Sequence, residues 1–144
     1  MTPDIEFRAA TADDMPYIYD SFRLGAKDSP WLNGQSAGVV LGALVVKPEW
    51  KITIAHFKDV PEEIIGWLLW KANGVKGSFY EPTQTVAWIC VKGPAMGNGI
   101  GHALLDFVGC DLSKEVLTVF TTSKANAKAH EKGIKLRLRP YMVL

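Results

Sequence analysis

The sequence predicts one domain over residues 1–144 of the α/β (α+β) class, with a mixed central sheet of about six to seven strands and about four flanking helices. Three observations predict this fold. The 144 residues are 48% hydrophobic and 22% charged, which is typical of a globular domain with a core. Helical and strand-like patterns alternate along the chain. One strand pattern, residues 85–91, is apolar on both faces, as in a central strand covered by helices.

Charge and composition argue against several classes of function. The net charge of +1 gives no electrostatic basis for binding nucleic acid. The N-terminus has no signal-peptide pattern, and the longest apolar runs, residues 37–46 and 64–70, are too short to span a bilayer. We therefore expect a cytoplasmic protein without a membrane partner. The scattered histidines and cysteines have no zinc-ligand spacing, so no metal is expected.

The first elements are a short strand and a capped helix. Residues 5–9 form the strand. Thr11 and Asp14 fit a capping box, in which each side chain bonds the other residue's free N–H. Because proline is tolerated only in the first turn of a helix, Pro16 predicts that the helix starts at Asp13.

A second helix and a pair of strands follow. The helix is expected over residues 35–46 and stops before Pro48. Residues 51–57 alternate and contain β-branched side chains, so they predict a strand. Residues 64–71, which are rich in tryptophan, predict another, and residues 59–63 are expected to form the hairpin connection between them.

The central strand, residues 85–91, runs into a glycine-rich turn at residues 97–101. An amphipathic helix is expected over residues 102–112. The side chains expected to face the sheet are Leu104, Leu105, Val108 and Leu112.

The last third completes the sheet. Residues 116–121 predict a second buried strand, parallel to the central one because a helix connects them. An alanine-rich helix over residues 123–132 ends at Gly133, a C′ glycine. Residues 134–138 alternate as a strand with one wet face, and residues 141–144 return as an edge strand.

The glycine-rich turn at residues 97–101 is the most informative motif. Glycines let the backbone approach a ligand, and the helix behind them begins with unpaired N–H groups and a partial positive charge. Such a turn binds a phosphate or pyrophosphate. The dinucleotide fingerprint fails at His102, where a third glycine is needed, and the Gly-Lys-Ser/Thr of a P-loop is absent. A tight turn without a ligand is the alternative.

The run from Met96 to Leu105 resembles the acetyl-CoA motif of the GNAT acyltransferase superfamily, Q/R-x-x-G-x-G/A followed by a helix. Residues 5–19 are similar to that family's first strand and capped helix, and residues 64–67 to its third strand. Residues 126–133 resemble, in shortened form, its late N-x-x-A-x-x-x-Y-E-x-x-G-F segment. The likeness spans most of the chain.

The resemblance implies the GNAT fold and acetyl-CoA as co-substrate. Main-chain N–H groups of the turn would hold the pyrophosphate, and the pantetheine arm would lie between diverging strands 85–91 and 116–121. The implied activity is transfer of an acetyl group to an amine on a small molecule or a protein. The sequence does not identify this acceptor. The residues assigned to acetyl-CoA are Ile89, Val91, Met96, Gly97, Asn98, Gly99, Ile100, Gly101, His102 and Asn126.

The catalytic groups depart from the family's pattern. Met96 stands where the family has Gln or Arg, and His130 stands near the family's tyrosine acid. His130 or Tyr141 is therefore the candidate proton donor to the leaving thiolate, with a surface histidine as the alternative for His130. The central strand lacks the family's glutamate base, and Glu81 just before it is the candidate. Cys90 has no identifiable base beside it and is interpreted as a packed thiol.

A second hypothesis belongs to a different class: a GNAT-fold binding or structural protein that does not catalyse transfer. The spacing of Arg8, Thr11, Tyr17 and residues 28–31 is similar to small GNAT-like proteins of bacteriophages. That likeness would place the protein in the host cytoplasm or the virion. GNAT-fold proteins often pair, and the sequence leaves a homodimer open.

Overall fold

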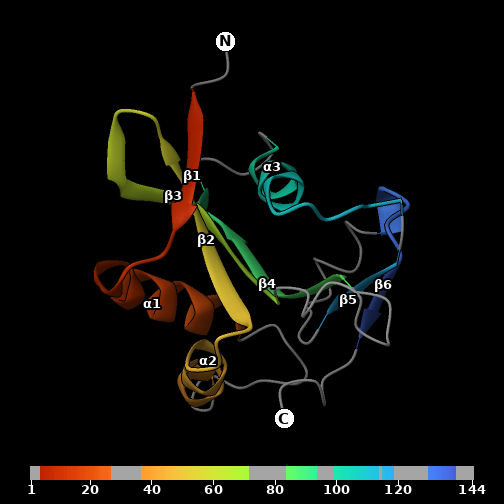
Figure 1. Ribbon diagram of the computed structural model, residues 1–144, viewed down its shortest axis with the longest axis horizontal. Coiled ribbons are helices and arrows are strands. Elements are labelled where there is room, and N and C mark those ends of the chain that lie inside the picture. Colours follow the sequence, from red (N-terminus) through yellow and green to blue (C-terminus); the bar gives the residue numbers. More distant parts are fainter. Residues whose placement is uncertain are drawn as a thin grey trace.

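The computed structural model describes residues 4–26, 37–71, 84–93, 99–113, 115–118 and 130–138. Within these ranges, six strands form one mixed sheet in chain order (Figure 1). The strands are β1 (Ile5–Ala9), β2 (Trp50–Phe57), β3 (Val60–Lys71), β4 (Gln84–Val91), β5 (Val116–Thr118) and β6 (Leu136–Leu138). The helices are a 3₁₀ turn, η1 (Ala12–Asp14), and α1 (Met15–Ala26), α2 (Ala37–Val45) and α3 (Ile100–Phe107). The α+β class predicted from the sequence is confirmed.

The sheet changes direction at β4. The pairs β1–β2, β2–β3 and β3–β4 are antiparallel, whereas the pairs β4–β5 and β5–β6 are parallel. The β4–α3–β5 connection is therefore the parallel crossover that the strand, helix, strand pattern predicts. Most of the helix expected over residues 123–132, and the edge strand expected over 141–144, lie outside the described residues.

The two faces of the sheet carry separate cores (Figure 1). On one face, α1 and α2 bury a cluster that contains Phe22, Leu41 and Trp67. On the other, α3 buries a smaller cluster that contains Leu68 and Leu104. Burial of these side chains is the main favourable term for the fold.

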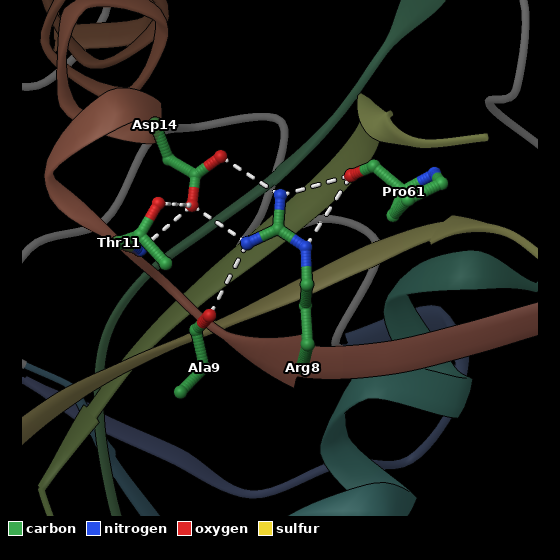
Figure 2. A network of polar contacts seen from close by, with 5 residues as sticks. All are labelled: Arg8, Ala9, Thr11, Asp14 and Pro61. Carbon is green, nitrogen blue, oxygen red and sulfur yellow. Dashed lines mark hydrogen bonds and ion pairs between the residues drawn. The ribbon is translucent and has the colours of Figure 1, made fainter.

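The N-terminal capping box is present, as Figure 2 shows. The Thr11 N–H donates to Asp14 Oδ2 at 2.7 Å, and the Thr11 hydroxyl donates to the same oxygen at 3.1 Å. The residues after the cap form the η1 turn, so α1 starts at Met15 and the predicted start at Asp13 was wrong. Pro16 still falls in the first turn of α1, where it removes no helical hydrogen bond.

The β2–β3 hairpin is tighter than predicted. Its turn is only Lys58 and Asp59, and β3 begins at Val60, which pairs with Phe57. The register shifts on both sides of His56, and such bulges bend and twist a hairpin. The expected connection over residues 59–63 was wrong because the first residues of β3 are exposed and carry no apolar pattern.

Helix α3 differs from its prediction at both ends. It starts at Ile100 rather than His102, and it ends at Phe107. Gly109 has φ +83° and its N–H donates to the Asp106 carbonyl, while the Cys110 N–H donates to the Leu105 carbonyl at 2.9 Å. This is a Schellman C-cap. The expected extension to Leu112 was wrong because the glycine stops the helix while the apolar spacing continues.

The end of the following helix matches its prediction. Gly133 has φ +70°, and its N–H donates to the His130 carbonyl at 3.1 Å. Gly133 therefore occupies the left-handed conformation expected of a C′ glycine. The strand after it begins at Leu136, two residues later than predicted.

Candidate functional site

Strand β4 pairs with β5 over the first three residues of β4. Gln84, Thr85 and Val86 pair with the three described residues of β5. Residues 119–121, over which the sequence predicts that β5 continues, lie outside the described residues. Directly after Val86 the register with β3 shifts, because Trp70 pairs with Val86 and Leu69 pairs with Trp88. Ala87 is thus an extra residue in β4, which forms a bulge.

The main-chain groups of Ile89 and Val91 point to the side of β4 on which β5 lies. The Lys92 N–H donates to the Ile65 carbonyl of β3 at 2.8 Å. Main-chain groups of successive strand residues point to opposite sides, so those of Val91 and Ile89 point away from β3. These are the two β4 residues that the sequence resemblance assigned to acetyl-CoA.

The N-terminus of α3 offers unpaired donors. Gly99 has φ +76°, and a Cβ at Gly99 would have no atom within 4 Å, so the position opens to space. The first intrahelical bond runs from the Ala103 N–H to the Gly99 carbonyl, at 2.9 Å. The N–H groups of Ile100, Gly101 and His102 therefore have no intrahelical acceptor. No acidic residue lies in the first turn, so nothing in that turn opposes an anion.

Two glycines bring this helix end close to β4. A Cβ at Gly101 would lie 3.3 Å from Ile89 Cδ1. A Cβ at Gly66 would lie 3.0 Å from the Cys90 carbonyl oxygen and 3.2 Å from Ile100 Cγ2. Sequence reasoning assigned Gly101 but missed Gly66. The available signal was a lone glycine inside an apolar strand, which often marks a close backbone approach.

Cys90 lies on the face of β4 that α1 covers, close to Tyr17 of α1. Burial raises the pKa of the Cys90 thiol, and hydrogen bonding to Ser21 and Trp67 only partly offsets this effect. Burial also raises the pKa of Tyr17, and the nearby Cys90 adds to the shift. Both groups are therefore neutral near pH 7. A neutral thiol is a poor nucleophile, which supports the interpretation of Cys90 as a packed residue.

The other assigned residues fall into two groups. His130 is exposed and lies three residues before Gly133. It precedes β6, and Lys135, the residue just before β6, accepts from the Val116 N–H. Because β4, β5 and β6 are parallel, His130 lies toward the starting edge of these strands, whereas Gly99 follows the end of β4. The structure does not bring the two together. Outside the described residues lie Glu81, Met96, Gly97, Asn98, Asn126 and Tyr141.

A separate cavity of about 340 Å³ lies along the outer side of α3. His102, Asp106, Cys110 and Asp111 line it. Asp111 already accepts hydrogen bonds from the main-chain N–H and the hydroxyl of Ser113. Two aspartates would repel a phosphate, so the N-terminus of α3 is the better place for one.

Comparison with known proteins identifies the fold. No family model matches the sequence, and no curated protein matches it either. The structure is similar to a possible acetyltransferase from Clostridium difficile 630, with 17% identity, a TM-score of 0.63, and 90% of this chain and 88% of that chain covered. It is also similar to an acetyltransferase from Trypanosoma brucei, with 16% identity, a TM-score of 0.60, and 94% and 96% covered.

A third similar structure is AAC(6')-Iy in complex with the bisubstrate analog CoA-S-monomethyl-acetylneamine. It has 12% identity and a TM-score of 0.58, with 93% of this chain and 91% of that chain covered. The structural neighbours are GNAT acetyltransferases, and this chain has the GNAT-like α+β fold. Nothing in these comparisons supports a bacteriophage origin. Among the described residues, no helix combines the length and apolar character needed to cross a bilayer.

Proposed function

We propose that this protein is an acetyl-CoA-dependent N-acetyltransferase that acts on an amine acceptor. One observation carries the proposal: Ile89 and Val91, whose main-chain groups point away from β3, are followed by a glycine-rich turn and by the N-terminus of α3 with its unpaired N–H groups. Strand main chain and a helix N-terminus offer what an amide-containing arm and a diphosphate require. The shared fold with AAC(6')-Iy, solved with a CoA-containing analog, supports the same ligand class.

The chain's own groups would hold acetyl-CoA, which supplies an activated acetyl thioester. The N–H groups of Ile100, Gly101 and His102 would bind the diphosphate, together with those of residues 96–98. Ile89 and Val91 would pair their main-chain N–H and C=O groups with the amides of the pantetheine arm, as an added strand pairs. Asn126 would contact the arm. No side chain is required to move, because a Cβ at Gly99 would already find open space.

Catalysis would rest on placement and on main-chain dipoles. A free N–H of β4 would stabilise the negative charge that develops on the carbonyl oxygen. Holding the acceptor amine beside the thioester would supply much of the rate. Glu81 would accept the proton of the amine, and His130, Tyr141 or water would give a proton to the leaving thiolate.

Calorimetric titration with CoA and acetyl-CoA tests the proposal. Wild type should bind both, and Gly99→Glu should abolish binding, because a carboxylate would enter the space for the diphosphate. Gly133→Glu is the matched control, since Gly133 also has positive φ and no atom near its Cβ position but lies away from the site. The control should bind as wild type does. Failure of wild type to bind either ligand would overturn the proposal.

A CoA-binding protein without transfer activity is the second candidate function. One observation favours it: the titratable groups that contact β4 beside Ile89 include Tyr17 and Cys90, and burial raises the pKa of both, so neither is a base at neutral pH. Release of free thiol from acetyl-CoA in the presence of an amine panel separates the two candidates. Binding without release, over a panel of small amines and lysine-containing peptides, would favour the second.

A further inference from the structure

We propose that Ser21 and Gly25 of α1 are positioning residues, which hold residues 88–91 of β4 in line so that a ligand can pair with the main chain of Ile89 and Val91. The inference rests on the proposed function and deepens it. Residues 88–91 pair with β3 on one side. Packing must fix the face of the strand, and α1 is the element that contacts Trp88 and Cys90 on that face.

Helix α1 and strand β4 run antiparallel with matched spacing. Four helix residues rise about 6 Å and two strand residues about 6.6 Å, so every fourth residue of α1 meets every second residue of β4. The three contacts are Tyr17 with Lys92, Ser21 with Cys90, and Gly25 with Trp88. All three fall on residues 88–91 of β4 or directly after them.

Ser21 links α1 to the sheet through a buried hydrogen-bond chain. The Trp67 indole N–H donates to Ser21 Oγ at 2.9 Å, and Trp67 is fully buried. The Ser21 hydroxyl in turn lies 2.8 Å from the Tyr17 carbonyl, which it can donate to. The Cys90 thiol contacts both Ser21 and Trp67. The hydroxyl thus joins three elements at the residue between Ile89 and Val91.

Gly25 allows the close approach of α1. A Cβ at Gly25 would lie 2.7 Å from Cζ2 of Trp88, so any larger residue must displace that ring. The Trp88 ring is also held edge-on by Phe22, with centroids 5.0 Å apart. Trp88 is the first residue after the bulge at Ala87, so its position sets the direction of residues 88–91.

A pair of isosteric variants tests the role of Ser21. Ser21→Ala removes the acceptor of the Trp67 N–H. Thr53→Val is the matched control, because Thr53 Oγ1 accepts from the Trp70 N–H, also at 2.9 Å, in the β2–β3 pair. Both variants lose one tryptophan–hydroxyl hydrogen bond and should lose similar stability. Only Ser21→Ala should speed amide hydrogen exchange in residues 88–91 and weaken CoA binding.

The size of the effect follows from the population of straight β4. If only a tenth of the Ser21→Ala molecules keep β4 in the conformation that binds CoA, the Kd of this variant for CoA rises about tenfold. Equal weakening by Ser21→Ala and Thr53→Val would show a merely structural role and overturn the inference. Unchanged exchange and affinity in Ser21→Ala would also overturn it. If the wild-type protein does not bind CoA, the proposed function is overturned instead. Amide hydrogen exchange at residues 88–91 still reports whether Ser21 holds the strand.

A second test uses the contact of Gly25 with Trp88. Gly25→Ala should weaken CoA binding, and adding Trp88→Phe, which removes the clashing ring atom, should restore it. Gly38→Ala is the control, since the nearest atom to a Cβ there is Arg23 Nε, at an ordinary 3.5 Å. Loss of CoA affinity in Gly25→Ala that the second substitution does not rescue would contradict the steric mechanism.

Discussion

Arg8 and Asp14 form a two-bonded ion pair between the end of β1 and the capping turn of α1 (Figure 2). Arg8 Nη1 and Nη2 donate to the two carboxylate oxygens at 2.7 and 2.8 Å. The same guanidinium donates to the Pro61 carbonyl of β3 at 2.9 Å. One side chain thus joins two strands and a helix cap.

This pair predicts a loss of stability in acid. Hydrogen bonding to Arg8 is the main cause that lowers the pKa of Asp14 from 3.8 to about 2. Because the folded-state pKa is depressed, the contribution is complete above about pH 4 and is lost as pH falls toward 2. The free energy of unfolding from urea titrations should fall by about 2 kcal/mol over that window. Asp14→Asn should flatten this part of the profile, and an unchanged profile would contradict the assignment.

Gly109 predicts a conformational rather than a packing effect. A Cβ there would meet nothing within 4 Å, but φ is +83°. Gly109→Ala should therefore lower the free energy of unfolding by about 1 kcal/mol, the strain of a left-handed alanine. Gly93→Ala is the control, because that position is equally open and its φ is not in the left-handed range. Equal stabilities of the two variants in chemical denaturation would contradict this explanation.

Cys90 predicts slow alkylation. Because burial raises its thiol pKa above 9.0, the thiolate should form only at higher pH. The rate of iodoacetamide labelling at Cys90, followed by peptide mass spectrometry, should therefore reach half its maximum above pH 9. A midpoint near neutral pH would identify a reactive thiol and contradict the packed interpretation.

Local signals in the sequence predicted the elements around the candidate site. The apolar pattern of residues 85–91 predicted the central strand β4, and the capping box of Thr11 and Asp14 is present. These features depend on neighbouring residues only. Anion binding at the glycine-rich turn stays a prediction. The early stop of α3 at Gly109 escaped prediction because the apolar spacing continues to Leu112.

Long-range contacts escaped prediction for a different reason. The role of Gly25 depends on Trp88, 63 positions later, and that of Gly66 depends on Cys90 and on the helix after it. A lone glycine signals a close approach but does not say to what. Likewise the bulge at Ala87 follows from the pairing of β3 with β4, and neither strand alone encodes it.

Gly66 predicts a functional effect outside the recognised motif. A Cβ at Gly66 would press on the Cys90 carbonyl oxygen at 3.0 Å, and main chain yields at greater cost than a flexible side chain. A Cβ at Gly101 would meet only side-chain atoms, Ile89 Cδ1 at 3.3 Å and Val91 Cγ2 at 3.8 Å. Gly66→Ala should therefore displace the first turn of α3 and cost about 1–3 kcal/mol of stability, as overpacked cores do.

The effect of Gly66→Ala on CoA binding should exceed that of Gly101→Ala, although Gly101 belongs to the glycine-rich turn and Gly66 does not. Calorimetric Kd values for the two variants, measured beside Gly42→Ala in α2 as a control, decide the order. A Cβ at Gly42 meets the Tyr19 hydroxyl at 3.3 Å, in the contact between α1 and α2 rather than at α3. If Gly101→Ala weakens binding more than Gly66→Ala, the turn itself sets the affinity, and the placement of α3 through Gly66 is not what limits it.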